Sequence, residues 1–425
     1  MVYEKVGILR FMTNKNGIGG RIKQDAEDFF VNEIANIDLN EGNYLIIKVK
    51  KKNWDTMNLA RVLSNILGIS QKRIYYAGTK DKRAIAIQYF SIKNANEEIV
   101  EKLKSSRLRD VEIEIVGNSR KAVNLGNLLG NEFSIKIVDV NTNEIEEKIE
   151  AIKRELMDKG TPNFFGLQRF GSIRYITHEV GKMIVKGKFE DAFWIYVAKP
   201  FEGESKEVKK IREELWNTRD EKFGLRELPK HLRYERLLLQ KLREGKDEEG
   251  ALLSLPKNLK MMFVHAYQSY IFNLLLSERI AEFESLKKIE DEDIISFVSF
   301  KQNKKRYYFF KEDYSIVKSN TKRRIKFLID KRRAALALPL PGYETKVEGW
   351  CKEKLNEILE KEEVKLKDFK NKYKEFSSKG SFRSADILAE WTNLSYEIEK
   401  NDVKFNFYLP KGCYATIFLR EFTKN

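Results

Sequence analysis

The sequence predicts an α+β protein with a mixed, mostly antiparallel sheet. The chain has 425 residues, of which 42% are hydrophobic, enough for two domains or one large one. Apolar residues recur at helical spacing in 59–67, in 145–156 and through much of the region up to about 290. Apolar and polar residues alternate with the period of a strand in four short segments: 44–50, 84–89, 111–115 and 133–137.

Residues 75–92 read as a strand, a tight turn that contains one glycine, and a second strand. The turn carries a single carboxylate, Asp81, among the cations Lys80, Lys82 and Arg83. Nearby positive charge favours the ionised form of a carboxylate, and an ionised acid on a rigid loop can act as a nucleophile. The alternative is structural, because aspartate is common in turns for its own hydrogen bonding.

The charge balance favours a polyanionic partner. Lys and Arg number 80 against 64 Asp and Glu, which gives a net charge of +16. Such an excess is typical of proteins that bind nucleic acid, and the alternative is a solvated basic surface. The strongest basic run is 318–333, with eight cations against one acid, Asp330. We expect Lys322, Arg323 and Arg324 in this run to contact phosphate.

Several function classes lack their sequence signatures. The two cysteines form no CxxC and the three histidines form no HExxH, so we expect no metal. Residues 16–20 do not make a dinucleotide-binding loop, because strand-like residues follow them where a helix is required. The chain shows no signal peptide and no apolar run of transmembrane length, so we expect a cytoplasmic protein.

Local signals place the remaining elements. Asp55 or Thr56 is a good N-cap for a helix that ends at Gly68, and a second helix is predicted for 95–104. The helix that begins near residue 145 ends near Gly160. The stretch 161–171 is predicted to be a loop because proline and glycine interrupt it. Its three phenylalanines either fill the core or present a face on which a base can stack.

Several stretches resemble motifs of the TruD family of tRNA pseudouridine synthases, in the family's order. Residues 76–88 are similar to Y-A-G-x-K-D-(K/R)-x-A-x-x-x-Q. Residues 23–33 resemble K-x-x-P-E-D-F-x-V-x-E, with Ala26 in place of the proline. Residues 162–171 resemble P-N-(Y/F)-F-G-x-Q-R-F-G, and 380–383 resemble G-x-(Y/F)-R. Shorter similarities cover 130–133, 266–273 and 339–342, and 405–421 resemble the family's closing hairpin, with a turn at Pro410-Lys411-Gly412. The chain is identified as an archaeal-type member.

The resemblance implies a fold and a domain arrangement. It implies a pseudouridine-synthase-like catalytic domain made of residues 1–175 and 376–425. A family-specific α+β domain, residues 176–375, is inserted between these two segments.

The resemblance also implies the residues of the active site. Asp81 corresponds to the nucleophile and Lys23 to its usual cation partner. Phe29 belongs to the site, Asn163 orients it, and Phe165 lies against the target uracil. Residues expected to bind RNA, from their charge and from these motifs, are Lys80, Lys82, Arg83, Arg169, Lys322, Arg323 and Arg324.

The implied function is the isomerisation of a uridine in tRNA, commonly at position 13, to pseudouridine, without cofactor or metal. Attack on C1′, attack on C6 and assistance to a glycal stay open, as does the oligomeric state. One alternative is a catalytically silent RNA-binding protein. A zinc base deaminase is the other, but it would need H-x-E and P-C-x-x-C, which the sequence lacks.

Overall fold

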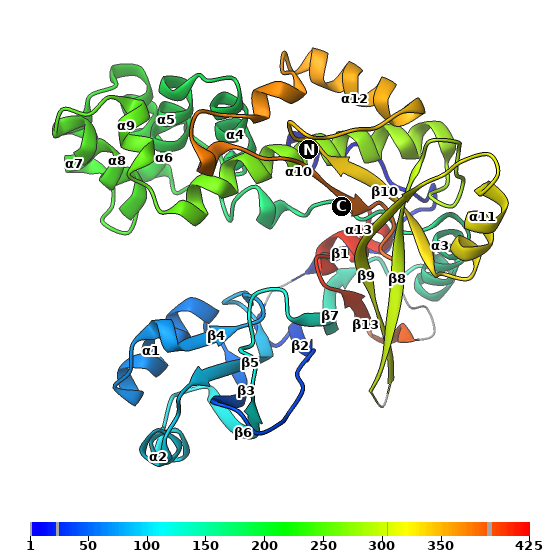
Figure 1. Cartoon of the computed structure of the whole chain (residues 1–425), viewed down its shortest axis with the longest axis horizontal. Helices are drawn as coiled ribbons and strands as arrows, with labels where there is room; N and C mark the ends of the chain where they lie inside the picture. The colour runs from blue at the N-terminus through cyan, green and yellow to red at the C-terminus, as the bar shows by residue number, and fades with distance from the viewer. Residues whose placement is uncertain (1, 23–24, 304, 389–392) are drawn as a thin grey trace. The chain divides into compact units, whose positions relative to one another are not determined.

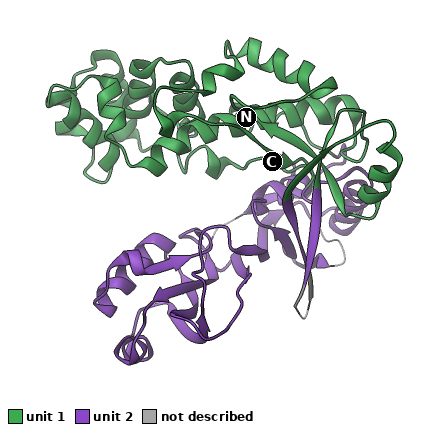
Figure 2. Ribbon diagram, in the orientation of Figure 1, with its two compact units in different colours: residues 1–12, 162–296, 312–386 green, residues 13–161, 297–311, 387–425 purple. Residues whose placement is uncertain are grey.

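The computed structural model describes residues 2–22, 25–303, 305–388 and 393–425. Contacts between residues divide the chain into two compact units, each assembled from three segments (Figure 2). Unit 1 comprises residues 1–12, 162–296 and 312–386, and unit 2 comprises residues 13–161, 297–311 and 387–425. The predicted division into 1–175 with 376–425 and 176–375 stays a prediction. By contacts, residues 162–175 and 376–386 belong to unit 1.

Unit 2 is built on a mixed sheet (Figure 1). Its strands are β1 (Gly19–Ile22), β2 (Phe29–Ala35), β3 (Tyr44–Lys52), β4 (Ile74–Tyr76), β5 (Ile85–Lys93), β6 (Val111–Ser119), β7 (Leu128–Val140), β12 (Ser395–Glu399) and β13 (Asp402–Pro410). They follow the order β12-β13-β7-β2-β5-β3-β6, with β1 beside β7 and β4 beside β5. β2 and β5 run parallel, whereas β7 is antiparallel to β2 and to β13, and β5 is antiparallel to β3 and to β4. The predicted α+β class with a mixed, mostly antiparallel sheet is confirmed.

Two helices, α1 (Thr56–Leu67) and α2 (Glu97–Ser105), share an apolar core with β3 and β5. Asp55 caps α1 by accepting a hydrogen bond from the Asn58 N–H at 2.8 Å. Gly68 ends the helix in the left-handed conformation that glycine adopts without steric cost. Leu59, Leu63 and Leu67 bury the apolar face of α1, as their spacing predicts. Packing on β3 and β5 therefore fixes the position of the N-terminus of α1, where Thr56 lies.

The predicted closing hairpin of residues 405–421 is wrong. The turn at Pro410-Lys411-Gly412 forms, but a helix, α13 (Ala415–Thr423), follows it. The true hairpin partner of β13 is the preceding strand, β12. Phe418 and Phe422 lie one helical turn apart, and both pack against aromatic residues of β13, with centroid distances of 4.7 and 5.2 Å. A helix buries both rings against the sheet, and this packing outweighs a composition that suggests a strand. The described residues of this unit also form a further α-helix, α3 (Ile145–Lys159).

Unit 1 is mainly helical. Its helices are α4 (Thr177–Val185), α5 (Phe189–Ala198), α6 (Lys206–Thr218), α7 (Glu221–Glu227), α8 (Arg233–Arg243), α9 (Glu248–Leu253), α10 (Lys257–Phe283), α11 (Lys322–Asp330) and α12 (Gly349–Lys361). A four-stranded sheet has the order β11 (Ser381–Ser384), β10 (Ala334–Leu340), β8 (Ile294–Asn303), β9 (Lys305–Ile316). Residues 297–311, which include parts of β8 and β9, group with unit 2. The long α10 contacts both α4 and β10, so residues on its two sides can hold separate segments of the unit in place.

Candidate active site

The Asp81 turn joins β4 to β5, as the sequence predicts. The two strands pair antiparallel, with Tyr76 opposite Phe90, and the residues between them form the turn. Asp81, Lys82 and Arg83 are exposed on it. The structure thus presents a carboxylate and two cations on the surface of unit 2, on a turn anchored at both ends by the sheet.

Two buried polar side chains fix the backbone of this turn. Thr56, the first residue of α1, accepts the Lys80 backbone N–H at 2.9 Å through its hydroxyl oxygen. The same hydroxyl donates to Gln88 Oε1 at 2.8 Å, and Gln88 Nε2 reaches the carbonyl oxygen of Gly78 at 3.5 Å. Because Thr56 and Gln88 are buried, these hydrogen bonds tie the turn to the N-terminus of α1 and to β5.

A buried ion pair supports the same turn from β2. Lys80 Nζ lies 2.5 Å from Glu33 Oε2, and their side chains are 7% and 0% exposed. The other carboxylate oxygen of Glu33 accepts the Tyr89 backbone N–H at 3.2 Å. Sequence reasoning assigned no role to Glu33, although alternation along β2 places it on the buried side with Phe29 and Val31. Lys80 is therefore held by Glu33 and helps to fix the turn, and the expected contact of Lys80 with RNA stays a prediction.

Lys51 adds a second buried cation that the sequence analysis missed. It lies on β3, is 1% exposed and donates to the carbonyl oxygen of Trp54. Burial lowers its pKa to about 8, while the negative charges of Asp55 and Asp81 act in the opposite direction. The negative charge of Asp81 thus favours the protonated form of the Lys51 amine, against the effect of burial. β3 contains four lysines, and in the sequence only the alternation of the strand, which places Lys51 on the same face as Ile47 and Val49, distinguishes it from the other three.

Asn163, in the motif of residues 162–171 in unit 1, makes hydrogen bonds with residues 383–385. Its side-chain Nδ2 donates to the carbonyl oxygen of Ser384 at 2.9 Å, and its Oδ1 accepts from the guanidinium of Arg383 at 2.7 Å. Its backbone N–H donates to the Ala385 carbonyl oxygen at 2.9 Å. The loop 161–171 is thereby joined to β11 and the residues that follow it. Arg383 lies in the G-x-(Y/F)-R similarity, but no role was predicted for it.

Phe165 packs under cations. Phe165 is 7% exposed, and the Arg383 guanidinium carbon lies 4.0 Å from the centroid of its ring. The backbone of Phe165 is clamped by Asn273 of α10, which accepts from its N–H at 2.8 Å and donates to its carbonyl oxygen at 3.1 Å. Arg169 lies 5.5 Å from the same centroid and donates to the hydroxyl of Ser269 at 3.0 Å. The ring is thus held rigidly by side chains of α10 and β11.

The other aromatic residues of the motifs belong to the core. Phe164 and Phe170 are buried, which matches the core alternative for this loop. Phe29 is also buried, and its ring meets the edge of Phe133 in unit 2 at a centroid distance of 6.1 Å. Lys23 lies outside the described residues. That Asp81, Asn163 and Phe165 meet at one uridine stays a prediction.

The middle of the basic run forms helix α11 (Lys322–Asp330). Arg323 and Arg324 are exposed, whereas Lys322 pairs with Glu290 at 2.7 Å and with Asp291 at 3.6 Å. Two of the three residues predicted here to bind phosphate therefore have exposed guanidinium groups on this helix, and Lys322 is engaged within unit 1.

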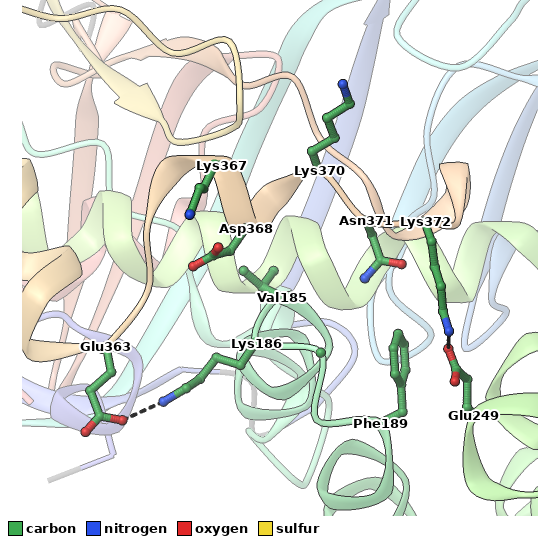
Figure 3. A pocket seen from close by; sticks show the side chains of 11 residues that line it. Val185, Lys186, Phe189, Glu249, Glu363, Lys367, Asp368, Lys370, Asn371 and Lys372 are labelled. Atoms are coloured by element: carbon green, nitrogen blue, oxygen red, sulfur yellow. Dashed lines mark hydrogen bonds and ion pairs between the residues drawn. The ribbon is translucent and has the colours of Figure 1, made fainter.

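A surface pocket of about 620 Å³ lies elsewhere in unit 1 (Figure 3). Lys186 pairs with Glu363 at 2.6 Å on one side of it, and Lys372 pairs with Glu249 at 2.7 Å on the other. No predicted site residue is among its described lining residues. Within the described ranges, no group of three or more His, Cys, Asp or Glu side chains is placed to hold a metal ion, and no helix is long and apolar enough to cross a membrane.

The fold and the clamped acidic turn define an α+β protein with a candidate site on the turn that carries Asp81. The family model described as "tRNA pseudouridine synthase D (TruD)" matches residues 5–422. The chain therefore belongs to the TruD family of tRNA pseudouridine synthases.

Individual relatives match over nearly their whole length. An Archaeoglobus fulgidus protein named "Probable tRNA pseudouridine synthase D" is 59% identical over 99% of this chain and 98% of its own. A Pyrococcus abyssi protein with the same name is 37% identical over 98% of this chain and 99% of its own. A crystal structure of a TruD protein from Methanosarcina mazei matches with a TM-score of 0.82 at 38% identity, covering 100% of this chain and 98% of that one.

Proposed function

We propose that this protein converts a uridine of tRNA to pseudouridine, with position 13 as the target, and that Asp81 is the reacting carboxylate. The observation that carries the proposal is the turn itself. An exposed aspartate stands on a loop whose backbone is held by Thr56 and Gln88, and the neighbouring lysine is buried against Glu33. A turn that served only to reverse the chain would not need a buried ion pair to fix it.

The reaction is an isomerisation, so its atoms balance without a co-substrate. The bond from ribose C1′ to uracil N1 breaks and a bond from C1′ to C5 forms. C5 loses a proton and N1 gains one. Attack of Asp81 on C1′, attack on C6 and assistance to a glycal all use the same carboxylate, and all need the base to leave its stack.

The residues around Asp81 would prepare it for this chemistry. Lys51 places a cation near the carboxylate, and Lys80 and Glu33 hold the turn that carries it. We assign to Lys23 the cation partner that the family motif implies. Lys82 and Arg83, exposed on the same turn, would contact the phosphates of a flipped nucleotide.

The second motif would complete the site. A rigid aromatic ring such as Phe165 contributes about 1–3 kcal/mol when a base stacks on it, which offsets much of the cost of flipping. In this structure Arg383 covers a face of that ring, so the guanidinium would shift or pass its contact to the uracil when the base enters. Asn163, which holds Arg383, would set the position of both.

The test is to map pseudouridine in tRNA from cells with and without the gene, and in tRNA transcripts incubated with the purified protein. We expect one uridine, at position 13, to depend on the protein in both experiments. The competing function, a catalytically silent RNA-binding protein, would give tight tRNA binding with no pseudouridine in either. We place the proposed enzyme in the cytoplasm.

A further inference from the structure

Helix α11 carries an exposed aromatic ring opposite its buried face. Ile325 and Ile329 are buried and form the inner stripe of the helix. At about 100° per residue, Phe327 lies about 180° from the middle of that stripe. Phe327 is 59% exposed. Among the residues of this helix, Phe327 thus points most directly into solvent.

Cations surround this ring. Arg323 and Arg324 precede Phe327 by one helical turn, and Lys331 follows it by one turn; all three are exposed. The Lys331 ammonium lies 5.7 Å from the ring centroid. Lys322, by contrast, projects from near the buried stripe and pairs with Glu290 and Asp291. The face of α11 that carries Phe327 therefore combines an aromatic ring with three cations.

A single exposed ring is ordinary by itself, but this combination has a specific chemistry. Aromatic rings flanked by Arg and Lys bind unpaired nucleotides, because the base stacks on the ring and the cations take the adjacent phosphates. A second copy of this chain fits less well. One aromatic side chain offers about 150–250 Å² for burial, whereas a stable interface needs about 800 Å² on each partner.

We propose that this face of α11, made of Arg323, Arg324, Phe327 and Lys331, binds an unpaired nucleotide of the RNA substrate by stacking its base on Phe327. The surface lies outside every motif that resembles the family's active site. The proposal rests on the proposed function only for the identity of the RNA, since the stacking chemistry is the same for any single-stranded segment.

The experiment compares the affinities of variants for a tRNA transcript and for a fully paired RNA duplex at one salt concentration. Phe327→Ala should weaken tRNA binding about tenfold and leave duplex binding unchanged, whereas Phe327→Trp should bind tRNA as the parent does. The double change Arg323→Gln and Arg324→Gln should reduce the slope of log affinity against log salt by about 0.7 for each lost phosphate contact. Lys322→Gln is the matched control, since its paired side chain should leave the slope unchanged.

Two outcomes would overturn the proposal. One is Phe327→Ala binding tRNA with the parent's affinity. The other is Phe327→Ala changing the oligomeric state without changing RNA affinity, which would make this face a contact between copies. The two proposals can fail separately. If the parent protein forms no pseudouridine, but Phe327→Ala binds tRNA more weakly than the parent does, the proposed function is refuted and this binding surface is supported.

Discussion

Replacing Glu33 by Gln tests whether the buried ion pair supports the Asp81 turn. Glutamine retains an oxygen for the Tyr89 N–H but removes the counter-charge of Lys80, whose side chain is 7% exposed. Removing one partner of a buried pair leaves an uncompensated charge, which costs about 3–5 kcal/mol. The charge of Lys80 can regain water if the turn moves, which limits the loss. We therefore expect a loss near the lower end of this range, about 3 kcal/mol, in the local stability of β4 and β5.

Amide hydrogen exchange of residues 74–93 measures this local stability directly. Adding Lys80→Met to Glu33→Gln should recover about 2 kcal/mol or more, because the uncompensated charge is gone. Glu98→Gln is the matched control, since Glu98 pairs with Lys102 at 2.6 Å on the surface of α2 and should show no measurable effect. Exchange in Glu33→Gln as slow as in Glu98→Gln would refute the reasoning.

Three further outcomes are expected. The pKa of Lys51 is about 8 in the folded protein against 10.5 ordinarily, so the unfolded chain binds more protons between these values and stability should rise with pH from about 8 to 10.5; Lys51→Met should lose this rise in urea titrations at several pH values, and parallel profiles would contradict the burial of this amine. Arg383→Lys keeps the charge but loses the planar contact with Phe165 and Asn163, so kcat should fall about 10- to 100-fold with KM for tRNA nearly unchanged, and a change in KM alone would point to a binding role instead. EDTA should leave turnover intact while the tRNA stays folded, because an isomerisation needs no redox chemistry; activity restored by one transition metal alone would refute this.

Local signals predicted much of the fold. The cap at Asp55, the stop at Gly68 and the alternation of β3 and β5 each act within a few residues, so the sequence displays them directly. The final helix α13 was missed for the opposite reason. Its β-branched and aromatic residues suit a strand when taken alone, and only packing of Phe418 and Phe422 on β13 decides for a helix.

The candidate site was predictable where a motif displays it and not where tertiary partners complete it. Asp81 and Gln88 stood out in the turn segment. Glu33 and Lys51 acquire their roles only when β2 and β3 align beside β5 and bring their inward side chains to the turn. Arg383 is separated from Asn163 by more than 200 residues, and no spacing within the sequence indicates their hydrogen bond.

The most direct test of the central claim is single-turnover pseudouridine formation by Asp81→Asn on tRNA that saturates the folded variant. Asparagine keeps the size of the side chain and removes its charge, and the adjacent residues in the chain are cations that cannot replace it. We expect formation to fall to background, with tRNA affinity unchanged or slightly higher because an anion has left a basic surface. If Asp81 were merely structural, its replacement would cost about 1 kcal/mol of stability and leave the folded protein active. A rate within about tenfold of the parent, a barrier change of only about 1.4 kcal/mol, would contradict the claim that Asp81 is the reacting group.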